Sequence, residues 1–245
     1  MLLLATDTSG KNGSVALARA TPGHGKVDVV EVDPLAGGTF SAQLVPQIAA
    51  LLAKHGYTKS DLAAFAVVSG PGSFTGLRVG LAAIKALAEV LQKPIAAISL
   101  LEAVAWSSPT RGRLLAVLDA GRHEIYAGDY ERRDYERRDD ARGADEVRGD
   151  HEFGPPLHMH SERLLSRDEM LAEAKGKPVV TPDAALAEVL GAAGVQCKRI
   201  DYPDSGVIAR LGWEHIERGQ TVRPEDLEAN YIRRSDAEIF SQPRR

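Results

Sequence analysis

The order of the predicted elements restricts the fold of this chain more than any other feature, because the same order occurs in both halves. In the first half, hydrophobic patterning predicts three strands followed by alternating helices and strands. These elements are residues 2–6, 14–19, 27–32, 41–54, 65–69, a helix that ends near residue 91, 95–99 and 100–106. Alternating helices and strands are typical of a three-layer α/β architecture.

The second half repeats this order without similarity of individual residues. The predicted elements are strands 114–118, 124–130 and one near 147–153, a helix over 161–175 capped by Ser161, strand 178–181, a helix from the cap Asp183 to about 193, strand 195–200 and helix 205–218. We therefore predict an α/β fold of two related lobes, residues 1–107 and 108–245, with the terminal segment packing back on the first lobe.

Composition excludes several classes of protein. A chain of 245 residues is long enough for one large domain or two small ones. Residues 1–7 lack the basic start of a signal peptide, and no stretch approaches the roughly 18 apolar residues that a membrane helix needs. Cys197 is the single cysteine, which excludes an intramolecular disulfide and a thiolate zinc cluster. We expect a cytoplasmic protein without membrane contact.

The acidic charge is concentrated in one segment. Residues 129–152 hold ten acidic and six basic residues, and so carry the whole net charge of -4. In this segment Tyr-Glu-Arg-Arg-Asp at 130–134 is repeated at 135–139. An acidic chain lacks the basic surface of a free-standing nucleic-acid binder. We interpret residues 130–148 as a mobile, solvated loop, and a contact arm for RNA or a partner is the alternative.

Two turns that contain an aspartate could face one cleft. Asp7, Thr8 and Ser9 follow the first strand and precede a glycine-rich turn, and Asp119 ends the corresponding strand of the second half. Such a turn offers a carboxylate and backbone N–H groups to a phosphate and its metal ion. A plain hairpin turn uses the same residue types for conformational reasons, so this alternative stays open.

A glycine-rich loop joins the fourth strand to the long helix. Residues 69–80 read Ser-Gly-Pro-Gly-Ser-Phe-Thr-Gly-Leu-Arg-Val-Gly. A strand end, a glycine loop and a helix N-terminus can bind an anion. The segment is neither a P-loop nor a nucleophile elbow, because the required Gly-Lys-Ser/Thr and the flanking glycines are missing. Ser73 is predicted to cap the helix.

The helix after this loop is apolar on most sides. Between residues 76 and 91 its only charged side chains are Arg78, Lys85 and Glu89, which share one narrow stripe. A helix of this kind is covered on most faces. It is either internal to its own chain or part of an interface between two chains.

No complete catalytic or metal site can be assembled from the sequence. The seven histidines include no His-x-x-x-His pair, and His158 and His160 lie beside a Pro-Pro loop. No serine, histidine and aspartate lie together at predicted strand ends. The segment Asn-Tyr-Ile-Arg-Arg-Ser at 230–235 is either a tail strapped onto the body or a plain surface segment.

The chain resembles the TsaB/YeaZ family along nearly its whole length. The twelve-residue segment 69–80 is similar to the family signature. Asp-Thr-Ser at 7–9, Leu-Asp-Ala at 118–120, Glu-Ile-Tyr at 124–126 and Tyr-Ile-Arg at 231–233 follow in the family's order.

The resemblance implies an actin-like, Hsp70-like fold and a non-catalytic subunit of the machinery that places threonylcarbamoyl on N6 of the adenosine beside the tRNA anticodon. The implied partners are a second copy, a TsaD-type catalytic paralogue, a TsaE-type ATPase and tRNA as the substrate of the complex. The paralogue carries a His-x-x-x-His metal site, which is missing here. No catalytic residue, metal or cofactor is expected, with weak nucleotide binding left open.

The resemblance also places the subunit interface on helices of the first lobe. The residues expected there are Leu44, Ile48, Leu51, Leu52, Phe74, Gly76, Leu77, Gly80, Leu81, Ala83 and Ile84. Asp7, Thr8, Ser9 and Asp119 would be a vestigial phosphate turn.

Some positions depart from the family pattern. Phe40 replaces a frequent histidine, Ala229 a frequent proline and Ile232 a frequent leucine. The rival classes are a kinase or ATPase of the same fold, which would use Asp7 and Asp119 around Mg-ATP, and a peptidase. The sequence lacks an evident adenosine-binding Gly-Gly pair and lacks a protease site.

Overall fold

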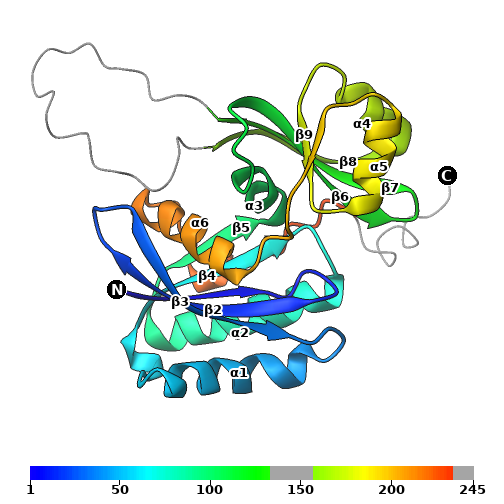
Figure 1. Ribbon diagram of the computed structural model, residues 1–245. Helices are drawn as coiled ribbons and strands as arrows, with labels where there is room; N and C mark the ends of the chain where they lie inside the picture. The colour runs from blue at the N-terminus through cyan, green and yellow to red at the C-terminus, as the bar shows by residue number, and fades with distance from the viewer. Residues whose placement is uncertain (133–156, 234–245) are drawn as a thin grey trace, which may run out of the picture.

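The computed structural model describes residues 1–132 and 157–233 and confirms the two-lobed α/β fold (Figure 1). The first sheet has the strand order β3-β2-β1-β4-β5, and the second has the matching order β8-β7-β6-β9-β10. The strands are β1 (Leu2–Asp7), β2 (Gly13–Thr21), β3 (Lys26–Leu35), β4 (Leu62–Gly70), β5 (Ile95–Ser99), β6 (Gly112–Gly121), β7 (Glu124–Arg132), β8 (Leu157–Ser166), β9 (Val179–Thr181) and β10 (Cys197–Arg199).

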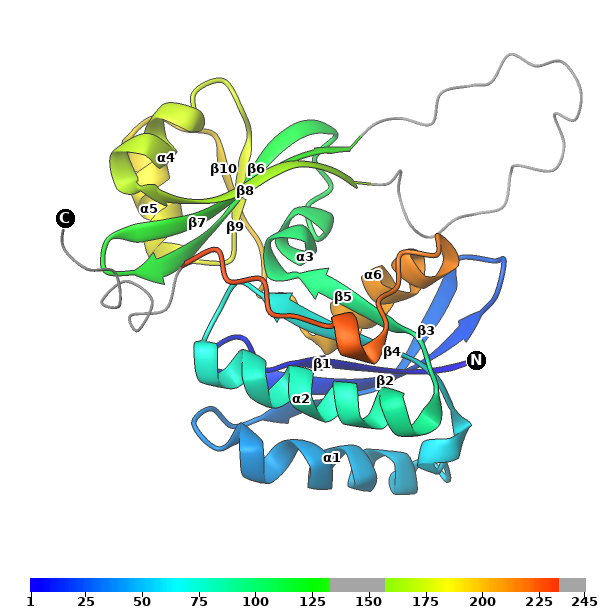
Figure 2. The ribbon, with the colours of Figure 1, turned by 180° about the vertical axis from the view of Figure 1, so that it is seen from behind.

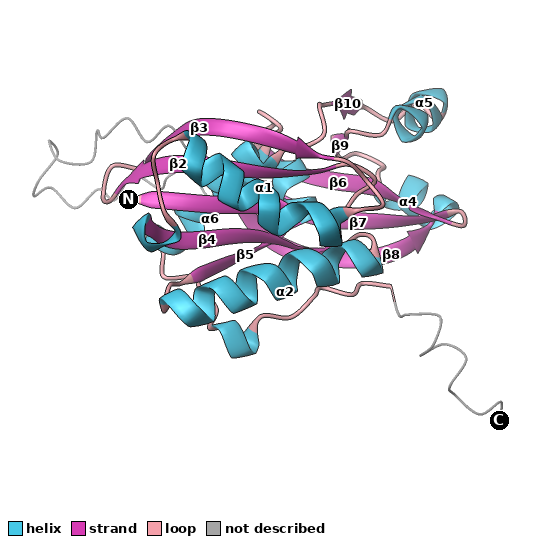
Figure 3. Ribbon diagram, turned by 90° about the horizontal axis from the view of Figure 1, so that it is seen from below, coloured by secondary structure: helices cyan, strands magenta, loops and turns pink. Residues whose placement is uncertain are grey.

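Helices cover both faces of each sheet (Figure 1). They are α1 (Phe40–Lys54), α2 (Phe74–Leu91), α3 (Leu100–Trp106), α4 (Arg167–Glu173), α5 (Ala184–Ala192) and α6 (Ser205–Glu217), with short 3₁₀ turns at η1 (Lys59–Asp61) and η2 (Pro224–Asp226). Seen from below, α1 and α2 lie across the outer face of the first sheet (Figure 3).

The two halves exchange one helix each. Although α6 belongs to the second half of the chain, it packs against all five strands of the first sheet. Conversely, α3 follows the first sheet in sequence and packs mainly against β6 and β7. The exchange explains why β1 is buried along its whole length, since helices cover it on both faces. A strand buried on both faces reads as a continuous apolar run, as Leu-Leu-Leu-Ala does here.

The helix predicted over 161–175 begins later in the structure, because residues 161–166 belong to the third strand of the second half. Residues 147–153 lie outside the described residues, and the strand that pairs with β7 is β8. Ser161 is therefore a strand residue and not a helix cap. The helix starts six residues later, where Ser166 and Glu169 form a capping box. Pairing with β7 overrides the helical pattern of residues 161–166.

The interpretation of residues 130–148 as a loop outside the core fails at its start. Tyr130 lies in β7 and is only 1% exposed, and Asp129 beside it is also buried. Residues 133–156 lie outside the described part of the chain. None of the helices within residues 1–132 and 157–233 is long and apolar enough to cross a membrane.

Candidate functional site

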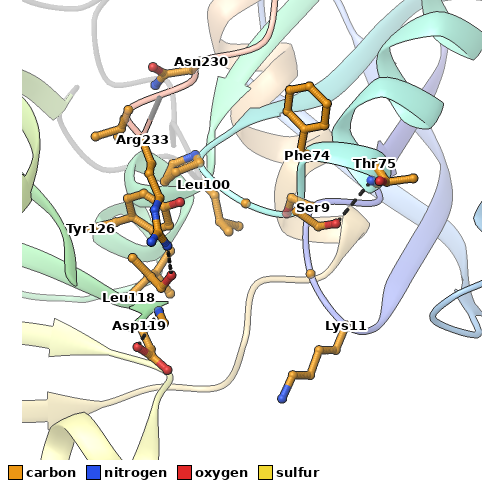
Figure 4. A pocket seen from close by; sticks show the side chains of 18 of the residues that line it. Ser9, Lys11, Phe74, Thr75, Leu100, Leu118, Asp119, Tyr126, Asn230 and Arg233 are labelled. Carbon is orange, nitrogen blue, oxygen red and sulfur yellow. Dashed lines mark hydrogen bonds between the residues drawn. The ribbon is translucent and has the colours of Figure 1, made fainter. Parts of the chain in front are cut away.

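A cleft of about 1140 Å³ lies between the lobes. One wall carries Ser9, Lys11 and Phe74 from the first lobe, and the other carries Asp119 and Tyr126 from the second (Figure 4). The segment 230–233 also lines the cleft. Both predicted aspartate turns therefore reach this region, as expected for lobes that face one cleft.

The carboxylate of the first turn is buried. Asp7 is 2% exposed and does not line the cleft, and its Oδ1 accepts hydrogen bonds from the backbone N and the hydroxyl of Ser9, at 2.8 and 2.6 Å. Burial raises the pKa of the Asp7 carboxyl, and the two bonds from Ser9 oppose that rise only in part. Thr8 is also buried, and its hydroxyl donates to the carbonyl oxygen of Gly76 at 2.7 Å. Asp7 therefore holds the turn in its own conformation, and Thr8 fixes it against α2.

The loop before α2 and Tyr202 pack closely on the first turn. The backbone N of Ser73 donates to the carbonyl oxygen of Ser9 at 2.7 Å. A Cβ atom at Gly72 would lie 2.5 Å from that same oxygen, so the loop before α2 touches the turn. The Tyr202 ring covers Gly10, and burial, together with the Asp7 charge, raises the pKa of its hydroxyl. This arrangement does not fit a metal-bound phosphate on Asp7.

The second turn is more open. Asp119 is exposed and lines the cleft, and its Oδ1 accepts from the backbone N of Gly121 at 2.8 Å. Arg233 lies beside it in Figure 4, with Nη1 donating to the carbonyl oxygen of Ala120 at 3.0 Å. Burial raises the pKa of the Tyr126 hydroxyl, which the charge of Arg233 partly offsets.

Phe40, which stands where the family often has a histidine, forms part of the cleft wall. It is the first residue of α1 and is 7% exposed. A Cβ atom at Gly13 would lie 2.8 Å from its Cε1, so the ring packs directly on the turn between β1 and β2. The apolar Phe40 ring thus packs against the Gly13 end of that turn.

Most residues expected in the subunit interface lie in the chain's own core, which corrects that prediction. The buried ones are Leu44, Ile48, Leu51, Leu52, Leu77, Leu81 and Ile84. Gly76 and Gly80 face Thr8, because a Cβ atom at either position would lie within 2.4 Å of a Thr8 oxygen. The two glycines therefore set the approach of α2 to its own sheet. Phe74 is 39% exposed, and Ala83 is half-buried.

The opposite faces of α1 and α2 are exposed, and the prediction did not name them. On α1 the exposed residues are uncharged up to Lys54, and Val45 is 57% exposed. On α2, Val90 is 73% exposed. We call this surface the α1–α2 outer face; its exposed apolar residues are Ala42, Val45, Pro46, Ala49, Ala50, Ala53, Ala82, Ala86 and Val90. The sequence signal was the run of residues 40–53 without a charge.

The histidines and Ser73 are the last residues that the sequence analysis singled out. Within residues 1–132 and 157–233, no group of three His, Cys, Asp or Glu side chains is placed to hold a metal ion. His158 and His160 stack edge to face, with ring centroids 5.0 Å apart, on the edge strand β8. Ser73 caps α2 as predicted, accepting from the backbone N of Gly76 at 3.3 Å.

Comparison with known proteins supports the same family as the sequence motifs. A family model described as "TsaD: tRNA N6-adenosine threonylcarbamoyltransferase" matches residues 34–178, more than half of the chain. The chain is 33% identical over 132 residues to the tRNA threonylcarbamoyladenosine biosynthesis protein TsaB of Bacillus subtilis, covering 54% of this chain and 56% of the relative. It is 32% identical over 136 residues to the Escherichia coli protein of that name, with the same coverage.

The chain spans about half the length of these curated relatives in the matched region. Solved structures extend the likeness of the fold to nearly the whole chain. YeaZ from Pseudomonas aeruginosa superposes with a TM-score of 0.65 at 24% identity, covering 94% of this chain and all of that one. A second structure, titled as an uncharacterised protein with similarity to peptidase YeaZ from the same organism, gives 0.69 at 24% identity, covering 95% and 99%. With its signature loop, its two aspartate turns and its matched sheets, the chain belongs to the TsaB/YeaZ family.

Proposed function

We propose that this chain is a non-catalytic subunit of the system that forms N6-threonylcarbamoyladenosine in tRNA, and that it binds and activates a TsaD-type catalytic subunit. The observation that carries the proposal is the α1–α2 outer face. Exposed apolar patches of this kind commonly mark interaction surfaces. In the isolated protein a second copy would use the same face, whereas in the complex the catalytic subunit occupies it. A TsaE-type ATPase and tRNA complete the proposed assembly.

The chemistry of the outer face suits a close helix contact. Four of its six exposed apolar residues on α1 are alanine, which lets a partner helix approach without displacing long side chains. The cores of stable interfaces are depleted in charge in the same way. A stable contact would bury about 1,200–2,000 Å² in total. The family model that describes the catalytic subunit also matches the part of this chain that contains α1 and α2, which favours a paired arrangement of related helices.

The geometry of the first turn supports a non-catalytic role. A kinase or ATPase that used Asp7 would need its carboxylate at the nucleotide phosphates. Here Ser9, Gly72 and Tyr202 enclose that carboxylate and its turn. We therefore propose that Asp7, Thr8, Ser9 and Asp119 form a vestigial phosphate turn with a structural purpose. Weak nucleotide binding elsewhere in the cleft is compatible with this role.

The proposal is tested by placing a charge on the outer face. Ala49→Arg on α1 should abolish co-elution with a TsaD-type subunit, and with it threonylcarbamoyl transfer to tRNA by the mixture. The matched control is Ala172→Arg on α4, which is equally an exposed helical alanine but lies on the second lobe. Both variants should keep the wild-type circular dichroism spectrum. Wild-type affinity in a folded Ala49→Arg protein would refute the assigned face.

Catalytic silence is tested separately. The isolated chain should release no phosphate from ATP and should transfer no threonylcarbamoyl group without its partner. Steady turnover that disappears in Asp7→Ala would instead support the kinase or ATPase class.

A further inference from the structure

The described C-terminal end of the chain crosses from one lobe to the other. After η2, the buried Leu227 holds the chain on the first lobe, and the chain then passes over the cleft toward β7 (Figure 2). We call residues 229–233 the C-terminal strap. It is separate from the chain connections that lead into β6 and into α6.

The strap begins by pairing with the first lobe. The backbone N of Asn230 donates to the carbonyl oxygen of Ser69, at the end of β4, at 2.7 Å. A Cβ atom at Gly70 would lie 2.6 Å from the carbonyl oxygen of Asn230, so the two backbones are in direct contact. Tyr231 stacks on Phe74, with ring centroids 5.2 Å apart, and its hydroxyl accepts from Nε of Arg78 at 3.3 Å.

Asn230 and Arg233 of the strap bind the second lobe with their side chains. Nδ2 of Asn230 donates to Oε2 of Glu162, on β8, at 2.7 Å. Arg233 donates to the carbonyl oxygen of Ala120 and forms an ion pair with Glu124 at 3.0 Å, both in the region of the β6–β7 turn. The Arg233 side chain is only 22% exposed, so solvent screens this pair less than a surface pair.

Glu162 accepts hydrogen bonds from the first sheet, the second sheet and the C-terminal strap. Its Oε1 accepts from the hydroxyl of Ser99, at the end of β5 in the first sheet, and from the hydroxyl of Tyr130 in β7. Its Oε2 accepts from the strap. One carboxylate therefore joins the first sheet, the second sheet and the C-terminal strap. Burial and the Glu162 charge raise the pKa of the Tyr130 hydroxyl, which keeps it protonated as a donor.

From these contacts we infer that the C-terminal strap is a clamp that holds the two lobes at one angle and so fixes the width of the cleft. Asn230 and Arg233 are the clamping residues. Glu162 accepts the hydrogen bond from Asn230, together with those from Ser99 and Tyr130. Two-lobed folds commonly change the angle between their lobes by hinge motion. A link that lines the cleft, bonds to both lobes and is separate from the chain connections restricts that motion. The role is additional to the proposed partner contact, since the α1–α2 outer face does not include the strap.

The test measures the distance between the lobes in solution. Spin labels are placed at Ala36→Cys, in the exposed loop before α1, and at Glu188→Cys, exposed on α5, after Cys197→Ser removes the single natural thiol. Double electron–electron resonance on protein diluted with unlabelled chain reports distances within one molecule. We expect one narrow distance distribution for the otherwise unchanged chain. The double change Asn230→Ala with Arg233→Ala should broaden it and shift it to longer distances.

The control replaces an arginine whose ion pairs are with residues two and three positions further along the chain. Arg223 forms ion pairs with Glu225 and Asp226, and all three side chains are exposed. Arg223→Ala should leave the distance distribution unchanged. An unchanged distribution in the double variant would overturn the proposal. Loss of the folded circular dichroism spectrum in that variant would overturn it too, because the strap would then be part of the folding core.

Partner binding separates this inference from the proposed function. The double variant should still bind a TsaD-type subunit through the α1–α2 outer face. A broadened distribution with intact binding supports both proposals. Intact clamping in a chain that never binds the partner would leave the clamp standing and overturn the proposed function alone.

Discussion

Thr8 and Gly76 are locked together where β1 meets α2. The Thr8 hydroxyl donates to the Gly76 carbonyl oxygen at 2.7 Å, and a Cβ atom on Gly76 would lie 2.0 Å from the carbonyl oxygen of Thr8. A contact that close to a backbone atom cannot be relieved by rotating a side chain. The small residues at this end of α2 therefore serve the packing of the chain on itself.

Replacing Gly76 should show whether it allows α2 to pack on its own sheet or leaves room for a partner. Gly76→Ala should lower the free energy of unfolding by about 1–3 kcal/mol, as overpacking does, measured by urea denaturation. If Gly76 only made room for a partner, alanine would instead stabilise the isolated chain by up to about 1 kcal/mol through helix propensity. The sign of the change separates the two roles. Ala82→Ser, on the exposed side of the same helix, should change stability little.

The buried carboxyl of Asp7 should make stability depend on pH. Its pKa is raised in the folded chain by burial. Once the pH exceeds about 3.9, the unfolded carboxyl ionises, whereas the folded one still holds its proton. The unfolded state is then favoured progressively until the pH reaches the folded pKa.

Asp7→Asn removes this effect and keeps an oxygen that accepts from Ser9. We expect the variant to gain stability relative to wild type as the pH rises above about 4, measured by urea denaturation over a pH series. Activity of the complete complex should survive. Loss of that activity in a folded Asp7→Asn protein would place Asp7 in the chemistry.

An ion-pair network in the second lobe should respond to acid in the opposite direction. Asp129 is 3% exposed at its side chain and accepts from Arg113 and Lys177, each at 2.7 Å. Burial alone would raise the pKa of Asp129, but the bonds to these two cations outweigh it and lower the pKa. The network therefore stabilises the fold above the unfolded pKa and loses that contribution as the pH falls through the folded pKa.

Asp129→Asn should accordingly cost about 1.5–3 kcal/mol at neutral pH, the usual range for hydrogen bonds to charged groups. The difference from wild type should shrink as the pH falls below about 4. A matched control is Asp28→Asn, whose pair with Lys26 at 3.9 Å is exposed on both sides. A constant difference across the pH range would mean that packing, rather than charge, accounts for the loss.

Hydrophobic pattern was enough to predict most elements of the first lobe and the start of the second. β5 and α3 have the predicted bounds, because short apolar runs there end at clear turn and cap residues. The pattern failed at residues 161–166, where β8 depends on pairing with β7 across a long sequence separation. The Ser-x-x-Glu capping box at Ser166 was the local signal that would have placed the helix correctly.

The candidate interface shows a different limit of sequence reasoning. A helix that is apolar all round does not reveal which side packs on its own sheet. Ile84 and Val90 are both branched apolar residues of α2, yet one is fully buried and the other 73% exposed. Their difference is set by the sheet that α2 rests on. The C-terminal strap was one of two alternatives in the sequence, and only its contacts with Ser69 and Glu162 distinguish them.

The exchange of α6 predicts that the first lobe cannot fold alone. Ile208, Leu211 and Trp213 of α6 are at most 2% exposed and belong to the same core as β1 and β4. The packing is close, since a Cβ atom at Gly212 would lie 2.4 Å from that of Ala66. A fragment of residues 1–107 would expose this apolar face of the sheet to water.

We expect the fragment 1–107 to lack a cooperative unfolding transition and to bind a hydrophobic dye. Joining residues 204–218 to it through a flexible Gly/Ser linker should restore a cooperative transition, because α6 then covers the sheet again. The linker needs no defined structure, as long loops cost little extra closure entropy. The control fusion carries Trp213→Ser, which leaves the helix length unchanged and removes its largest apolar contact. Cooperative unfolding of the bare fragment would show that α6 is dispensable, and the two halves would then be independent folding units.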